Sequence, residues 1–152
     1  MSLLSNTFMV NVKKLRNDAI IPTQGSQYAA GYDLYAAIDT PITIKSEETV
    51  KIGTGLAFEL PEGFFAGIFA RSGLATKQGL RPANCVGVVD CDYRGEVIVA
   101  IHNDSNRNTV IAPGDRIAQM ILLPYQSMEF TEVNNLNETD RGDGGFGSSG
   151  NN

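Results

Sequence analysis

The sequence predicts an all-β domain, a sandwich or barrel of many short strands with one short helix. Two observations support this fold class. Apolar and polar residues alternate along several segments, as they do in strands that bury one face. Gly, Pro and Asn separate these segments at residues 60–65, 79–84, 102–108 and 112–115. Short strands at such close spacing are typical of β-sandwiches and β-barrels.

The alternation is strongest in residues 49–60 (TVKIGTGLAFEL) and 96–102 (EVIVAIH), where the apolar side chains fall on one parity. Residues 116–124 (RIAQMILLP) are almost continuously apolar, which predicts a buried strand. Shorter candidate strands are residues 8–15 (FMVNVKKL), 40–45 (TPITIK) and 127–133 (SMEFTEV).

One helix is expected at GLATKQ, residues 73–78, where it would complete about a turn and a half. Ser72 precedes this segment and is expected to be its N-cap, since a serine side chain accepts from free N–H groups. Gly79 follows the segment and is the expected C-cap.

Composition limits the classes of function. The 152 residues favour a single domain. The formal net charge of −5 argues against a general nucleic-acid or anionic-membrane binder. There is no run of 18 apolar residues and no signal-peptide cleavage pattern, so we expect a cytoplasmic protein.

The two cysteines, Cys85 and Cys91, lie six residues apart in a strand-like run. An extended chain would separate them by about 20 Å, beyond the reach of a disulfide, so free thiols are expected. The single histidine, His102, argues against a Ser-His-Asp triad and against a histidine-rich metal site. Carboxylates, arginines and backbone groups must therefore carry any chemistry.

Two stretches combine charged residues with apolar surroundings. In FARSGLATKQG, the Arg71 guanidinium suits phosphate oxygens, and Ser72 stands where a helix would present free N–H groups. Alternatively, Ser72 only caps the helix and Arg71 pairs with a surface acid. In NCVGVVDCDYRGEV, Asp90 follows Val88 and Val89, so partial burial would make its carboxylate a better base for water. Alternatively, Asp90 only hydrogen-bonds a hairpin turn formed by residues 92–95.

In two further stretches, the sequence allows two roles for a polar residue. In AAGYDLYAA, Asp33 is either an ion-organising acid or a buried acid satisfied by an arginine. In PGDRIAQMILL, Gln119 interrupts an apolar run, so either a ligand or the backbone must satisfy its amide.

The last twelve residues, RGDGGFGSSGNN, form the one low-complexity segment. The chain is acidic and shows no secretion signal, so an adhesion role for RGD is not expected. The pattern G-x-x-x-x-G-K-[ST] is absent, which excludes a Walker P-loop. A glycine-rich backbone can nevertheless surround an anion while an aromatic ring stacks on a base.

In their order and spacing, these five stretches closely resemble the five motifs of the homotrimeric dUTP pyrophosphatases (dUTPases). The resemblance extends from AAGYDL to GFGSSG and covers most of the chain. It implies a jelly-roll-like β-barrel at residues 1–138 with a flexible C-terminal arm at 139–152. It also implies a homotrimer that shares three active sites, and hydrolysis of dUTP to dUMP and pyrophosphate with Mg²⁺ on the triphosphate. Such an enzyme keeps uracil out of DNA and supplies dUMP for thymidylate synthesis.

The same resemblance implies a role for each matched residue. Asp90 would be the general base that activates water for in-line attack on the α-phosphorus. Tyr93 would pack beneath the deoxyribose and exclude a 2′-hydroxyl group. Uracil would be read by Asn84, the backbone of Gly87, Val88 and Val89, and the nearby Ile98.

The phosphates would be held by Arg71, Ser72 and Gly73, with Gln119 near the phosphate chain. Asp33 would contact Mg²⁺ only through water. From the arm, Arg141 would bind the γ-phosphate, Phe146 would stack over uracil, and Gly147 and Ser148 would donate to the phosphates. Ser149 stands where the family often has threonine, and Cys91 occupies a variable position.

Two other functions are compatible with a dUTPase-like fold. The related dCTP deaminases carry a different residue set around the RSG motif and rely on a glutamate, whereas RSGLA and GVVDCDYRG are intact here. A non-catalytic nucleotide-binding module could lose Asp90 or the tail, and this chain has both. Ammonia release from dCTP, or dUTP binding without hydrolysis, would favour these alternatives.

Overall fold

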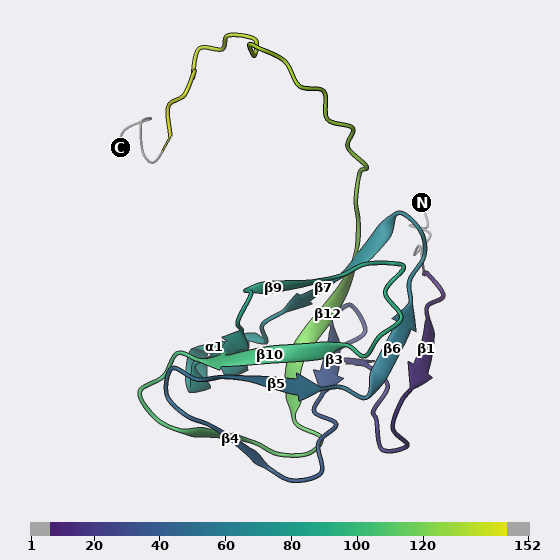
Figure 1. Cartoon of the computed structure of the whole chain (residues 1–152). Coiled ribbons are helices and arrows are strands. Elements are labelled where there is room, and N and C mark those ends of the chain that lie inside the picture. The colour runs from purple at the N-terminus through teal and green to yellow at the C-terminus, as the bar shows by residue number, and fades with distance from the viewer. Residues whose placement is uncertain (1–6, 146–152) are drawn as a thin grey trace.

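The computed structural model describes residues 7–145 and confirms the all-β class (Figure 1). The strands are β1 (Asn11–Lys14), β2 (Thr23–Gln24), β3 (Tyr32–Tyr35), β4 (Ile42–Ile44), β5 (Thr49–Gly53), β6 (Leu56–Glu59), β7 (Phe64–Phe69), β8 (Leu80–Pro82), β9 (Val86–Val89), β10 (Ile98–Asn103), β11 (Thr109–Ile111) and β12 (Arg116–Pro124). The helix α1 (Ser72–Gln78) lies between β7 and β8.

Within the described range, the strands form four hydrogen-bonded sheets rather than one continuous cylinder. Three are small, with the orders β1-β6, β5-β10-β8 and β11-β4. The fourth has the order β2-β3-β12-β7-β9, so the long strand β12 joins β3 to β7 and leaves β9 at an edge. This arrangement brings together segments that are far apart in the sequence.

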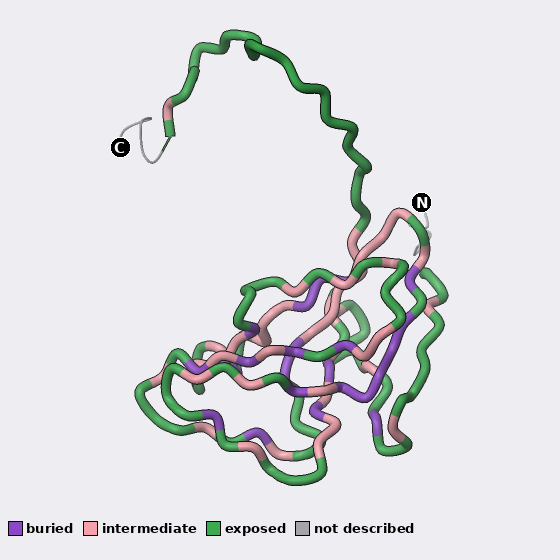
Figure 2. The backbone as a smooth tube through the Cα atoms, viewed as in Figure 1, coloured by how far each residue is buried: buried purple, intermediate pink, exposed green. Residues whose placement is uncertain are grey.

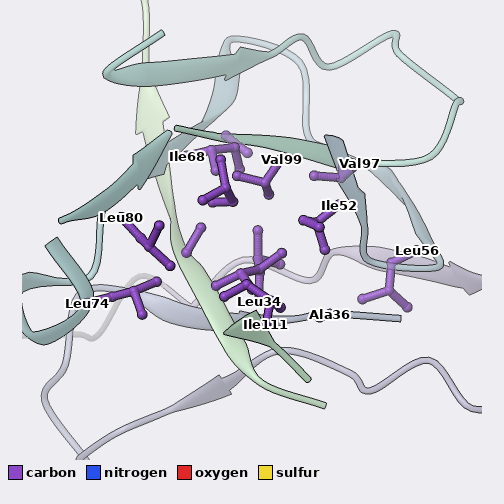
Figure 3. Close-up of a cluster of buried hydrophobic side chains, with 14 of the residues drawn as sticks. Leu34, Ala36, Ile52, Leu56, Ile68, Leu74, Leu80, Val97, Val99 and Ile111 are labelled. Carbon is purple, nitrogen blue, oxygen red and sulfur yellow. The ribbon is translucent and has the colours of Figure 1, made fainter. Parts of the chain in front are cut away.

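The inward faces of these sheets meet in one hydrophobic core (Figures 2 and 3). Strand β10 shows the expected alternation, because Val99 and Ile101 are buried while Ile98 is half exposed. Val97 is also buried, as its parity predicts. Other core residues include Leu34, Ile44, Ile52, Leu56, Ile68, Leu80, Ile111 and Ile117.

The helix prediction is correct at its end and wrong by one residue at its start. Gly79 is the C-cap in the left-handed region, with φ of 70°, and its N–H donates to Ala75 and Leu74 carbonyls. Ser72 is the first helical residue, and the N-cap is Arg71, whose side chain makes no capping hydrogen bond. Arg71 has extended backbone angles, and its guanidinium pairs with Asp33 instead.

The predicted strand at residues 127–133 is wrong, because that segment forms no strand in the described chain. From Gln126 to Gly145 nearly all residues are exposed, and the segment extends away from the sheets (Figures 1 and 2). Its apolar residues find no neighbouring strand in this chain; Phe130 is 85% exposed. Strand β12 forms as predicted, although most of its length is only half buried.

Cys85 and Cys91 are both free thiols, as expected from their spacing. Between Thr7 and Gly145, no helix is long and apolar enough to cross a membrane.

Asn103 is a fully buried polar residue that connects β10 to the loop that follows it. Its amide donates to the carbonyls of Ile44 at 3.0 Å and Arg107 at 2.8 Å, and its oxygen accepts from Ser105. We expect Asn103→Ala to lower the free energy of unfolding by about 2–3 kcal/mol, since these buried groups would lose their partners.

Urea unfolding at one fixed protein concentration measures this loss. The matched control is Asn108→Ala in the same loop, where the asparagine is exposed and little change is expected. Equal stability of the two variants would show that the Asn103 network contributes nothing specific.

Candidate active site

A partly buried acid and two arginines form the first group of candidate residues. The Nε of Arg71 donates to Asp33 Oδ1 at 2.8 Å, and Nη1 of Arg116 donates to Asp33 Oδ2 at 3.2 Å. The Asp33 side chain is only 13% exposed. Of the two roles left open for Asp33, the structure thus shows the acid whose carboxylate is satisfied by arginines. One carboxylate and two guanidinium groups leave a local excess of one positive charge, which suits an anion.

Gln119 lies between Asp33 and the residues that precede α1. It lies on β12 opposite both Asp33 on β3 and Phe69 on β7. Its Nε2 donates to the carbonyl of Ala70 at 2.8 Å, so the backbone satisfies the amide. A Cβ on Gly31 would collide with the Gln119 carboxamide. The amide therefore helps to fix the segment that leads into Arg71, Ser72 and Gly73.

Ser72 and Gly73 are both exposed at the start of α1. A Cβ on Gly73 would meet no atom within 4 Å, so the approach to this turn is open. Exposed N–H groups beside a positively charged guanidinium can bind phosphate oxygens.

The second group lies on β9 and in the turn that follows it. Asp90 is exposed, so the partial burial expected from its valine neighbours is wrong for the single chain. The reason is that β9 is an edge strand, on which Val88 is itself 63% exposed. The Tyr93 N–H donates to the Asp90 carbonyl at 3.2 Å, so the chain turns at residues 90–93, two residues earlier than the turn expected at 92–95.

The edge position of β9 has a chemical consequence. One side of its backbone pairs with β7, and within residues 7–145 the other side pairs with no strand. Because hydrogen bonds to β7 engage alternate residues, part of the backbone N–H and C=O groups along Gly87, Val88 and Val89 points away from β7 and can face the polar edge of a base. Asn84 is exposed and its amide lies near Gly87, whereas Ile98 starts β10 in a different sheet.

A cavity of about 600 Å³ opens beside Asp90. It is lined by Leu60, Glu62, Asp90, Cys91, Asp92, Arg94 and Tyr125. The Sγ of Cys91 lies 4.0 Å from the Tyr125 hydroxyl, and this hydrogen bond raises the pKa of Tyr125. No local pattern predicts that Tyr125 lies here, because it follows the end of β12 and is 34 residues from Cys91 along the chain.

The two groups lie at opposite ends of the same pair of strands. Val86 pairs with Phe69, just before Arg71, while Val89 pairs with Ala66 near the beginning of β7. Asp90 is therefore about 13 Å along the sheet from the Val86 end, at the usual rise per strand residue. A single chain does not bring Asp90 beside Arg71.

The tail contributes nothing to either group within the described residues. Arg141 is exposed, and its Nε donates locally to the carbonyl of Gly144 at 2.8 Å. The predicted contacts of Phe146, Gly147 and Ser148 lie outside the described residues.

The candidate residues form an acid–arginine anion site and an edge strand suited to a base, as a nucleotide-processing protein requires. The dUTPase family model matches residues 17–150. A deoxyuridine 5′-triphosphate nucleotidohydrolase of Desulfitobacterium hafniense (strain DSM 10664 / DCB-2) is 49% identical over 148 residues, covering 95% of this chain and 98% of the relative. One from Rickettsia felis is 47% identical over 142 residues, covering 93% and 96%.

Solved structures agree with these relatives. The Staphylococcus bacteriophage 80alpha dUTPase with dUPNHPP is 27% identical, with a TM-score of 0.81, covering 95% of this chain and 99% of that one. The chain therefore belongs to the dUTPase family, a class of nucleotide hydrolases. The family, the enzyme class and the jelly-roll-like fold expected from the motifs are thereby confirmed.

Proposed function

We propose that this chain hydrolyses dUTP to dUMP and pyrophosphate, in the cytoplasm, and so keeps uracil out of DNA while supplying dUMP for thymidylate synthesis. One observation supports this most directly: a single five-stranded sheet carries both a cationic group around Arg71 that suits phosphate and an edge strand that is followed by Asp90. Relatives named for this activity match along almost the whole chain.

In the proposed mechanism, Asp90 accepts a proton from water, which attacks the α-phosphorus in line with the departing pyrophosphate. Arg71, Ser72 and Gly73 hold the phosphates, and Gln119 lies near the phosphate chain. Positive charge and N–H donors placed at the developing negative charge stabilise the transition state.

The base and sugar are read by the second group. Asn84, the backbone of residues 87–89 and Ile98 bind uracil in a hairpin too narrow for a 5-methyl group. Tyr93 packs beneath the deoxyribose and excludes a 2′-hydroxyl. Arg141, Gly147 and Ser148 of the arm donate to the phosphates, and Phe146 stacks over the base.

We further propose a homotrimer with shared active sites. Arg71 and Asp90 lie at opposite ends of β7 and β9, so one chain presents two incomplete halves. If neighbouring copies meet so that these halves face each other, each nucleotide contacts more than one chain. A sedimentation measurement distinguishes a trimer from a monomer.

Mg²⁺ is the cofactor that fits these residues. The described chain contains no cluster of three or more His, Cys, Asp or Glu side chains suited to a metal. Both Asp33 oxygens already accept from arginines, which leaves lone pairs for water rather than room for a direct metal bond. Mg²⁺ commonly keeps several waters and binds through substrate phosphates, where it neutralises charge on the triphosphate.

The test mixes the purified full chain with dUTP and Mg²⁺ and measures dUMP and pyrophosphate. We expect both products with dUTP and much less turnover of dTTP and UTP. No pyrophosphate, or equal turnover of the three nucleotides, would overturn the proposal. Ammonia from dCTP would indicate a deaminase, and tight dUTP binding without products would indicate a non-catalytic module.

A further inference from the structure

Gly95 lies directly against the ring of Tyr93. A Cβ built on Gly95 would collide with the Tyr93 hydroxyl oxygen and would lie 2.5 Å from Cζ and 2.9 Å from Cε2. Real Cβ atoms essentially never come closer than 3.0 Å to another heavy atom. The present position of the ring is therefore compatible with glycine and with no other residue at position 95.

The turn around this ring is fixed at several points. The Tyr93 hydroxyl donates to the Glu96 carbonyl at 3.0 Å. Arg94 donates from Nη1 to the Cys91 carbonyl at 2.7 Å, and the Glu96 carboxylate accepts from the Gly55 N–H at 2.8 Å. These contacts hold the backbone of the turn while the hydroxyl end of the Tyr93 ring rests on Gly95.

The outer part of the ring remains open to solvent, since Tyr93 is 46% exposed. The atoms that a new Cβ would contact are at the far end of this side chain. A substitution at position 95 would thus rotate the ring outward about its two side-chain torsions, with little effect on the buried core. Its consequence would be a displaced ring rather than an unfolded protein.

We propose that Gly95 is a positioning residue whose missing side chain fixes the Tyr93 ring and thereby sets the preference for deoxyribose over ribose. This inference rests on the proposed role of Tyr93 beneath the sugar. A ring held against the backbone leaves no space for a 2′-hydroxyl, whereas a ring rotated outward makes that space available. An enzyme that rejects ribose by leaving no space for the 2′-hydroxyl needs a side chain that is held rigidly in place.

The test is Gly95→Ala in the full chain, with kcat/KM measured for dUTP and for UTP. We expect the ratio of the two values to fall by roughly 10- to 100-fold, the usual worth of a small steric difference in a pocket. Thermal unfolding should change little. The matched control is Gly25→Ala, because a Cβ there meets nothing within 4 Å, and it should leave the ratio unchanged.

A double variant separates positioning from folding. In a Tyr93→Ala background, Gly95→Ala should not change the ratio further, because the two residues act through one ring. If Gly95→Ala alone does not fold, Tyr93→Ala/Gly95→Ala must fold, since the collision is gone; an unfolded double variant overturns the proposal.

Two outcomes distinguish this proposal from the function on which it rests. A wild-type chain that hydrolyses dUTP selectively, with the same selectivity in a folded Gly95→Ala variant, overturns the role of Gly95 alone. A wild-type chain that shows no dUTP hydrolysis, or no preference over UTP, overturns both.

Discussion

Replacing Asp90 with asparagine should lower kcat for dUTP by about 10²- to 10⁴-fold, the usual contribution of a positioned general base. Asparagine has nearly the same shape but cannot accept the proton that water must lose. Asp90 is exposed at the end of an edge strand, so the substitution removes no core packing and leaves no buried group unsatisfied. Nucleotide affinity, which other residues would supply, should therefore change little.

Steady-state kinetics with dUTP and equilibrium binding of a non-hydrolysable dUTP analogue measure the two quantities separately. Asp92→Asn is the matched control, because Asp92 is an exposed carboxylate in the same turn. A loss confined to Asp90→Asn supports the general base. Undiminished turnover by Asp90→Asn, or an equal loss in both variants, would remove Asp90 from that role.

The strands that the sequence predicted best are those whose partners lie within the chain. In β10 and the residue just before it, alternate residues Val97, Val99 and Ile101 are buried because sheets on the same chain cover one face. Residues 127–133 show a similar pattern but find no neighbouring strand here, so their β-propensity is not realised. Alternating apolar and polar residues indicate that one face of a strand favours burial. Whether that face is buried depends on the tertiary structure.

The candidate site shows the same limit. The sequence identified Asp33 and Arg71 as charged residues among apolar ones, but they are 38 positions apart and either could have paired elsewhere. Strand β12 decides the outcome, because it places β3 and β7 on its two sides. Similarly, the apolar neighbours of Asp90 suggested burial, which its position on an edge strand prevents. Sheet order is a long-range property that local patterns do not encode.

Deleting residues 141–152 should leave the protein folded and oligomeric while reducing dUTP turnover by at least about 10²-fold, the usual cost of losing a group that stabilises the transition state. The described part of this segment makes only local hydrogen bonds, from Arg141 to Gly144 and between Gly142 and Thr139. Removal of its described part, residues 141–145, therefore takes no contact from the core. The loss of activity would follow from losing the proposed phosphate donors and the cover that excludes water.

If the glycine-rich arm orders only on the nucleotide, as proposed, it loses conformational entropy at binding and contributes to rate mainly through contacts made at that moment. An Arg141→Ala variant of the full chain, which removes one phosphate contact but keeps the rest of the arm, should have activity between the wild type and the deletion. Circular dichroism, sedimentation and kcat measured on the same samples test this order. If the deletion unfolds the protein or dissociates the oligomer, the tail is structural; if full activity remains, it is not part of the active site.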